Sequence, residues 1–326
     1  MKKRTYILAC LILLVTAAIS LLAGNGSISS SEVFDCLIGG GTALQKVIVF
    51  RIRIPRIVAA TASGAALSVS GYLLQKDLNN SLASPGILGI NNGAGLFVLL
   101  YACIFPYRYG GKCLAAFLGA LLVTSAIYAL ASGTGMSKTS VVLSGVAVSA
   151  FCLSLIDIII SLKPETVADR AAFQLGGFAT LSPASVVFAV PVIAVVLILS
   201  WLFAPSLDIL IMGDETAGGL GVNVKRYRGA FIFFAAILSG AAVSMCGIIG
   251  FLGLIVSNVL KLFYRGNGRG GILLCAVSGS VFLMICDLLG RNLVFPYEIP
   301  CGLFLSITGA PFMIWMLIKK RKRLGA

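Results

Sequence analysis

The sequence predicts an all-α membrane protein, a bundle of about ten transmembrane helices. Hydrophobic residues make up 59% of its 326 residues, charged residues make up only 11%, and the mean hydropathy is +1.05. A soluble domain carries about 25% charged residues. Apolar stretches long enough to cross a bilayer, about 20 residues, recur along the whole sequence. The short alternating segments typical of a membrane β-barrel are not found.

Ten spans are predicted in order along the chain. The first follows Lys2-Lys3-Arg4 but is longer than the roughly 7–15 apolar residues of a signal peptide, so we interpret it as a retained helix. Prolines in the first helical turn support several later starts, for example Pro55 and Pro183. The ten spans lie at about residues 5–23, 57–75, 86–104, 113–131, 139–162, 184–203, 230–247, 249–264, 272–290 and 301–318.

The distribution of basic residues predicts that both termini are cytoplasmic. With that orientation most of the 25 lysines and arginines fall on the cytoplasmic side, as the positive-inside rule requires. The net charge of +14 is therefore a topology signal, and no nucleic-acid partner is expected. Arg51, Arg53 and Arg56 are an anomaly, because they form a basic cluster on the outer side, where arginine is disfavoured.

Several kinds of site are not expected. The nine cysteines form no C-x-x-C pair and the chain has no histidine, so neither a metal site nor a disulfide framework is predicted. No cofactor is expected, and no catalytic residue, because no base or nucleophile has a recognisable partner. The glycine-rich stretches at 39–41 and 266–271 lack the G-x-x-x-x-G-K-[ST] spacing of an ATP site. Any ATP must be hydrolysed by another subunit.

A polar segment, residues 212–229, separates the sixth and seventh spans. Asp214 and Glu215 suit the start of a short helix through the helix dipole. Gly218 and Gly219 predict a hinge, and together with Gly221 they allow a tight bend between two short helices. Three basic residues follow. These features predict a folded surface that contacts a cytosolic partner; the alternative is an ordinary polar loop.

The sequence also contains an internal similarity. Residues 63–71 read SGAALSVSG and residues 239–247 read SGAAVSMCG. Small residues at this spacing let membrane helices pack closely. One interpretation is a duplicated bundle, with spans 2–5 and 7–10 as related halves, a frequent design among transporters. The other is convergence on a small-residue packing face.

Motifs spread over most of the chain resemble one known family. They are RIPR at 53–56, NSLASPGILG at 80–89, GDETAGGLGVNV at 213–224, IGFLGL at 249–254, DLLGR at 287–291 and GAPF at 309–312. Together they are similar to the permease subunits of bacterial iron–siderophore and cobalamin ABC importers, the FecCD family. One departure is that Ser257-Asn258 stands where the family usually has Pro-His.

The resemblance implies one permease domain over residues 1–326, in the cytoplasmic (inner) membrane of a bacterium. It also implies a second permease subunit, cytosolic ATPase subunits, an extracytoplasmic binding protein and surrounding membrane lipid as partners. The expected substrate is a ferric siderophore, with cobalamin or haem as alternatives, and homodimer and heterodimer stay open. An ion-driven secondary transporter is a remote alternative, because Asp157 and Asp287 are its only candidate groups and both lie near span ends.

The resemblance also assigns roles to particular residues. In the segment 204–229, ATPase coupling is expected of Gly213, Glu215, Ala217, Leu220, Gly221 and Val222, with Leu220 and Val222 as exposed apolar side chains. Docking of the binding protein is expected of Arg53, Arg56 and Arg291. For Arg291 a structural pair with Asp287, four residues earlier on a helix, is the competing interpretation. Asp157 and the helix-kinking Pro311 are pathway candidates.

Overall fold

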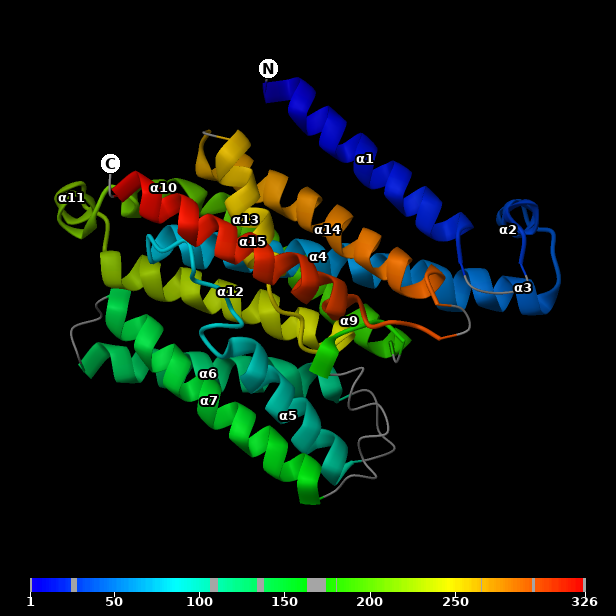
Figure 1. The fold of residues 1–326 in the computed structure, drawn as a ribbon, viewed down its shortest axis with the longest axis horizontal. Helices are drawn as coiled ribbons and strands as arrows, with labels where there is room; N and C mark the ends of the chain where they lie inside the picture. The colour runs from blue at the N-terminus through cyan, green and yellow to red at the C-terminus, as the bar shows by residue number, and fades with distance from the viewer. Residues whose placement is uncertain are drawn as a thin grey trace.

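The computed structural model describes residues 2–24, 28–105, 111–133, 138–162, 174–179, 181–264, 266–294 and 297–324. Every regular element in these ranges is a helix (Figure 1). The first half contains α1 (Lys2–Leu22), α2 (Ser30–Leu37), α3 (Ala43–Val47), the π-helix η1 (Ile48–Arg53), α4 (Ile54–Asp77), α5 (Ile90–Ile104), α6 (Lys112–Gly133) and α7 (Lys138–Leu162). The second half contains α9 (Pro183–Leu202), α10 (Ala204–Leu210), α11 (Asp214–Gly219), α12 (Val224–Cys246), α13 (Leu252–Phe263), α14 (Gly268–Asn292) and α15 (Cys301–Leu324).

The predicted all-α membrane fold is confirmed. Within the described part of the chain, 7 helices are long and apolar enough to cross a membrane, and shorter apolar helices lie at Ile90–Ile104, Leu252–Phe263 and Cys301–Met316. Each of the ten predicted spans corresponds to one of these helices. The second span begins earlier than predicted, at Ala43, because η1 continues directly into α4. A π-turn disrupts the usual backbone hydrogen bonds, and Pro55 lies just after it, in the first turn of α4.

Helices α4 and α12 form the centre of the bundle. About three quarters of their most apolar windows are buried, 78% for the span of α4 and 72% for α12, against 6% for α1. Helix α4 packs against α12, α13 and α14, and α12 packs against α4, α6 and α9. Helix α1 lies on the outside of the bundle, mainly along α14 (Figure 1).

The two similar sequence motifs lie on these two central helices. A Cβ added to Gly64 of α4 would lie 2.5 Å from the carbonyl oxygen of Gly279 in α14. One added to Gly240 of α12, the position that matches Gly64, would lie 2.9 Å from the Cβ of Ala120 in α6. In a duplicated bundle, spans 4 and 9 are equivalent, so equivalent glycines contact equivalent helices, α6 and α14. This pattern supports the interpretation that the two halves are related.

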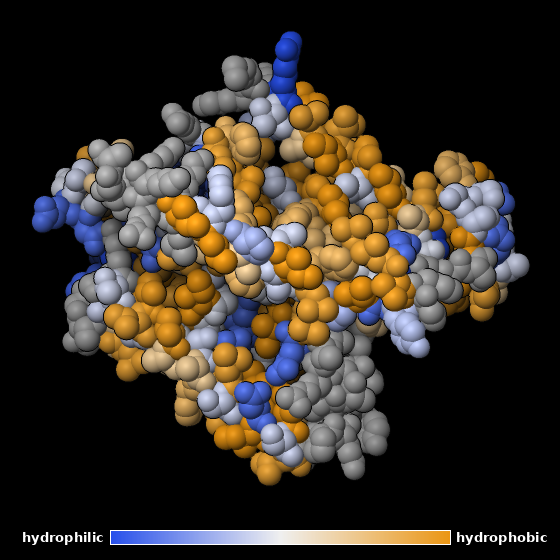
Figure 2. Space-filling model, viewed as in Figure 1, coloured by the Kyte–Doolittle hydropathy of each residue, from blue (hydrophilic) through white to orange (hydrophobic). Residues whose placement is uncertain are grey.

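The two ends of the bundle differ chemically from its middle. Helix α11, the first turn of α12 and the end of α15 lie together at one end, and α2 and α3 lie at the other (Figure 1). Figure 2 shows hydrophobic side chains over much of the visible face, with hydrophilic groups beside α11, at the N-terminus and over the end that carries α2, and a smaller hydrophilic group in the lower middle. The middle of the bundle therefore suits a bilayer and its ends suit water.

Candidate functional site

The predicted coupling segment folds as two short helices, α10 and α11, before the chain enters α12. Helix α10 packs against α4 and α14, with Ala204, Leu207 and Leu210 fully buried. Helix α11 is attached through Ala217, which is also fully buried. The backbone N–H of Ala217 donates to the carbonyl of Gly213 (2.9 Å), and that of Val222 donates to the carbonyl of Ala217 (3.0 Å). The segment is therefore folded rather than an irregular loop.

The bends of this segment lie at Gly221, which was one of the predicted glycines, and at Gly213, which was not predicted as a bend. Gly213, before α11, has φ +112°, and Gly221, after it, has φ +81°. Side chains rarely adopt such angles, so these two positions favour glycine. Gly218 and Gly219 instead form the last turn of α11, with ordinary helical φ. The predicted hinge at Gly218 and Gly219 was wrong, because helix α11 continues through both residues, whereas the predicted bend at Gly221 is present.

Helix α11 presents one face to the bundle and the other to the outside. Glu215 is exposed and lies in the first turn, and Leu220 has 62% of its surface exposed. Val222, predicted to be equally exposed, packs partly against the central core. An isolated apolar side chain as exposed as Leu220 is not unusual, but here it stands on a fixed helix end. The outward surface of this segment therefore centres on Leu220 and Glu215.

A buried arginine connects this segment to the centre of the bundle. Arg228, in the second turn of α12, donates to both carboxylate oxygens of Asp214 (3.1 and 2.9 Å), at the start of α11. Its Nε also lies 3.5 Å from a carboxylate oxygen of Asp77, the last residue of α4. Arg228 is 3% exposed and Asp77 is fully buried. One guanidinium thus joins α11, α12 and the central helix α4, and sequence reasoning missed this role.

The predicted docking arginines gather at the opposite end. Arg56, in the first turn of α4, donates to Asp287 of α14 (2.8 Å from Nη2) and to Glu298 (2.9 and 3.1 Å). The predicted pair of Arg291 with Asp287 is present, with Nε 3.3 Å from the carboxylate. Asp287 is therefore shared by two arginines, and only Glu298, which is 34% exposed, lies toward the solvent.

The remaining contacts of this cluster hold the end of α1. Arg291 donates to the carbonyl (3.1 Å) and hydroxyl (2.8 Å) of Ser20. Arg53 donates to the carbonyl of Leu21 at 2.8 Å and to that of Gly24 at 3.4 Å. Arg53 is 3% exposed and Arg291 is 5% exposed, so both have internal partners in this single chain. Arg51 of the same basic cluster is exposed.

The pathway candidates lie on two other helices. Asp157 is exposed on α7, and Pro311 is exposed within α15. The structure does not bring them together with either end cluster. The Ser257-Asn258 departure lies inside α13, which continues to Phe263. There the Asn258 amide donates to the carbonyl of Ser81 (2.9 Å) and binds α13 to the turn after α4.

Comparison with known proteins places this architecture in context. The sequence matches the FecCD transport family over residues 12–319. It is 33% identical over 316 residues to the Fe(3+)-citrate import system permease protein YfmD of Bacillus subtilis (strain 168), covering 97% of this chain and 95% of that protein. It is 31% identical over 283 residues to the hemin transport system permease protein HmuU of Yersinia pestis, covering 85% and 84%.

Two further comparisons broaden the picture. The chain is 32% identical over 321 residues to the vitamin B12 import system permease protein BtuC of Vibrio vulnificus (strain CMCP6), covering 97% of this chain and 94% of that protein. A solved structure described as an inward-facing conformation of a metal-chelate type ABC transporter superposes with a TM-score of 0.84 at 23% identity. That comparison covers 98% of this chain and all of the other, and it bears on the fold alone.

Proposed function

This chain belongs to the FecCD transport family, and on that premise we propose that it is the membrane-spanning permease subunit of an ABC importer. Residues 1–326 form a single permease domain in the cytoplasmic membrane of a bacterium. Separate cytosolic ATPase subunits supply the energy, and an extracytoplasmic binding protein delivers the substrate. A second permease subunit, either a copy of this chain or a related protein, completes the transport pathway.

The observation that supports ATPase coupling most strongly is the folded surface around α11. Leu220 is 62% exposed at the end of a helix that is fixed by buried Ala217 and by the Arg228–Asp214 ion pair. A fixed apolar side chain fits a groove on a partner better than a mobile one, because less conformational entropy is lost on binding. We assign contact with the ATPase to Leu220 and Glu215, and positioning of that contact to Gly213, Ala217, Gly221 and Val222.

A ferric siderophore is the proposed cargo. The relatives named above are permeases of import systems for Fe(3+)-citrate, hemin and vitamin B12, and others serve hydroxamate and enterobactin chelates of iron. Iron chelates are thus the commonest cargo among these names. The chain has no histidine, so the iron would cross within its chelate rather than as an ion held by imidazole ligands. Haem or cobalamin is the second candidate, since those relatives are nearly as similar.

Docking of the binding protein is proposed at the outer arginine cluster. Arg56 is the most accessible of the three arginines at 12% exposure, and it already binds half-exposed Glu298 through two hydrogen bonds. A carboxylate of the binding protein would replace Glu298 in this two-point contact, a geometry that the planar guanidinium favours. Arg53 and Arg291 would hold the surrounding surface through their bonds to the end of α1.

Uptake in cells that lack this chain tests the proposal. Deletion should abolish uptake of one radiolabelled ferric siderophore while cobalamin and haem uptake continue. Wild type and the conservative variant Leu220→Met should restore it, whereas Leu220→Asp should insert normally and fail, because a carboxylate does not fit an apolar groove. Loss of only cobalamin or haem uptake would replace the cargo, and normal uptake by Leu220→Asp would refute the assignment of α11.

A further inference from the structure

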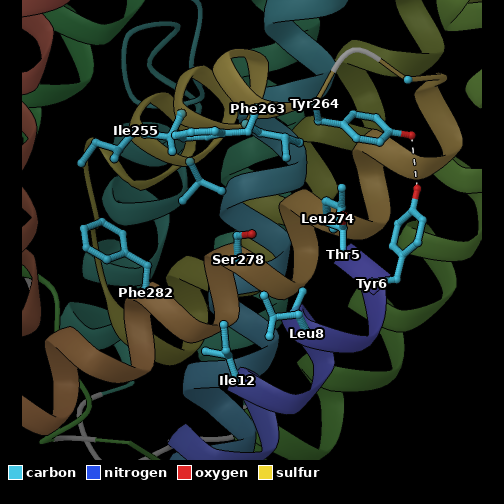
Figure 3. Close-up of a pocket in the computed structure, with 15 residues that line it drawn as sticks. Thr5, Tyr6, Leu8, Ile12, Ile255, Phe263, Tyr264, Leu274, Ser278 and Phe282 are labelled. Carbon is cyan, nitrogen blue, oxygen red and sulfur yellow. Dashed lines mark hydrogen bonds between the residues drawn. The ribbon is translucent and has the colours of Figure 1, made fainter. Parts of the chain in front are cut away.

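Helix α1 is fastened to the bundle by hydrogen bonds near both of its ends, and a groove opens beside its N-terminal half. Near its outer end, Ser20 accepts hydrogen bonds from Arg291 of α14. Near its N-terminus, the hydroxyl of Tyr6 lies 3.2 Å from the hydroxyl of Tyr264, the residue after α13. Between these contacts α1 leaves a groove of about 690 Å³ against α13 and α14. Figure 3 shows this groove with the tyrosine pair at one end.

The groove is mostly apolar, with Thr5, Ser278 and the two tyrosines as its polar lining residues. Its walls include Leu8 and Ile12 from α1, Ile255 and Phe263 from α13, and Leu274 and Phe282 from α14 (Figure 3). Leu8 is 59% exposed and Phe263 is 84% exposed, so the groove is open along its side. In a chain that crosses a membrane, this open side faces hydrocarbon rather than water. The groove therefore suits a flexible apolar chain that enters from the bilayer.

The dimensions of the groove match one leaflet. On α14 its lining extends from Leu274 to Phe282, which is about 12 Å of helix. The hydrocarbon of a single leaflet is roughly 15 Å thick, half of a core of about 30 Å. The volume also lies in the range of roughly 300–1,000 Å³ that holds small ligands. One acyl chain fits both the length and the volume.

The residues that precede the groove in the sequence are basic, which favours an anionic headgroup. The first turn of α1 carries Lys2, Lys3 and Arg4, immediately before the lining residues Thr5 and Tyr6. This end is the one predicted to lie in the cytoplasm, where anionic lipids gather and where basic pockets between helices bind their headgroups. Tyrosine pairs at this depth are typical of the interface between hydrocarbon and headgroups. The complementary charge is a lipid phosphate with a net negative headgroup.

We propose that this groove binds one anionic glycerophospholipid of the cytoplasmic leaflet, with an acyl chain between α1, α13 and α14 and its headgroup beside the exposed Arg4. The bound lipid fills the groove beside α1 and thereby fixes α1 against α14. The other end of α14 carries Arg291 of the arginine cluster. The proposal depends on the membrane-spanning fold and not on which substrate is transported.

Lipid binding to the purified full chain tests the proposal. Phosphatidylglycerol and phosphatidylcholine with identical acyl chains are titrated in detergent and counted by native mass spectrometry. Ala9 lines the groove, whereas Ala18 is exposed on the same helix and does not line it. Ala9→Trp should lower phosphatidylglycerol affinity about tenfold or more by filling the groove, and the matched control Ala18→Trp should bind like wild type. Ser278→Phe, on the opposite wall of the groove, should lower phosphatidylglycerol affinity to the same extent. It replaces Ala9→Trp as the test if Ala9→Trp does not fold.

A second variant distinguishes the contribution of the lipid headgroup from that of the acyl chain. Replacing Lys2, Lys3 and Arg4 by glutamine should lower phosphatidylglycerol affinity by about tenfold or more, since each basic residue near the surface contributes to anionic lipid binding. Phosphatidylcholine binding should stay unchanged. Equal binding of the two lipids by wild type would overturn the anionic assignment. Equal lipid binding by the two tryptophan variants, or by folded Ser278→Phe and wild type, would overturn the groove itself.

Discussion

Replacing Arg228 by methionine should release α11 from the central helix. Methionine keeps most of the apolar length of the side chain and removes its charge. Asp77, fully buried, would lose the guanidinium that lies 3.5 Å away, whereas Asp214, 48% exposed, would return to water. Removing one member of a buried ion pair costs about 3–5 kcal/mol, and an exposed pair contributes about 0–1 kcal/mol. We therefore expect Asp77 to dominate the loss of about 3–5 kcal/mol in unfolding free energy.

A double-mutant cycle with Asp77→Asn measures this interaction. Reversible unfolding of the purified chain by denaturant in mixed micelles gives the free energies. Asp77→Asn alone should cost less than Arg228→Met, about 1–3 kcal/mol, because Arg228 keeps Asp214. The double variant should cost less than the sum of the two single changes, with a coupling energy of about 1–3 kcal/mol.

Asp214→Asn is the matched control for the exposed partner. It keeps the shape of the side chain and should cost less than about 1 kcal/mol, since nearly half of Asp214 is already in water. A loss below about 1 kcal/mol for Arg228→Met, or additive effects in the cycle, would refute the reasoning. Arg228 would then not connect α11 to α4.

Three other perturbations follow from the same structure. Asp287→Asn should lower thermal stability in detergent far more than Glu298→Gln, because it removes the buried carboxylate shared by Arg291 and Arg56, about 3–5 kcal/mol against about 0–1 kcal/mol; equal shifts in Tm would contradict this. Gly71→Ala should destabilise the chain, because its Cβ would lie 2.6 Å from the Gly253 carbonyl oxygen, whereas Gly218→Ala has open space and a gain of up to about 1 kcal/mol in helix propensity. Unfolding midpoints that move in the same direction for both glycines would count against the close packing. Glu298→Gln should also strengthen binding of the cognate binding protein in a surface-immobilised titration, since a competitor for Arg56 is removed; weaker binding would argue against docking there.

The sequence was sufficient to locate the transmembrane helices because apolar length is a local property. Each span could be recognised without knowing its neighbours, and glycine motifs such as that at Gly64 could be assigned to helix packing. The exact start of the second span could not be predicted. Pro55 suggested a beginning there, but the helix already begins before it and runs through η1 into α4.

The partners of the charged groups could not be predicted. Arg56 and Asp287 are far apart in sequence and meet only because α4 and α14 lie side by side. The buried contact between Arg228 and Asp77 depends on the packing of α4 against α12 in the same way. Pairing at i,i+4, as between Asp287 and Arg291, is local, and it was predicted correctly.

The energy source of transport is the most direct test of the central claim, that this chain is an ABC importer permease. The complete assembly of this permease, its ATPase and its binding protein is reconstituted in vesicles with controlled ATP and ion gradients, and uptake of the labelled ferric siderophore is followed. We predict that uptake requires ATP on the side of α11, persists when a protonophore and a sodium ionophore collapse both gradients, and is lost in Leu220→Asp. Uptake that stops with the gradients while ATP remains, or that proceeds without ATP, would contradict the account.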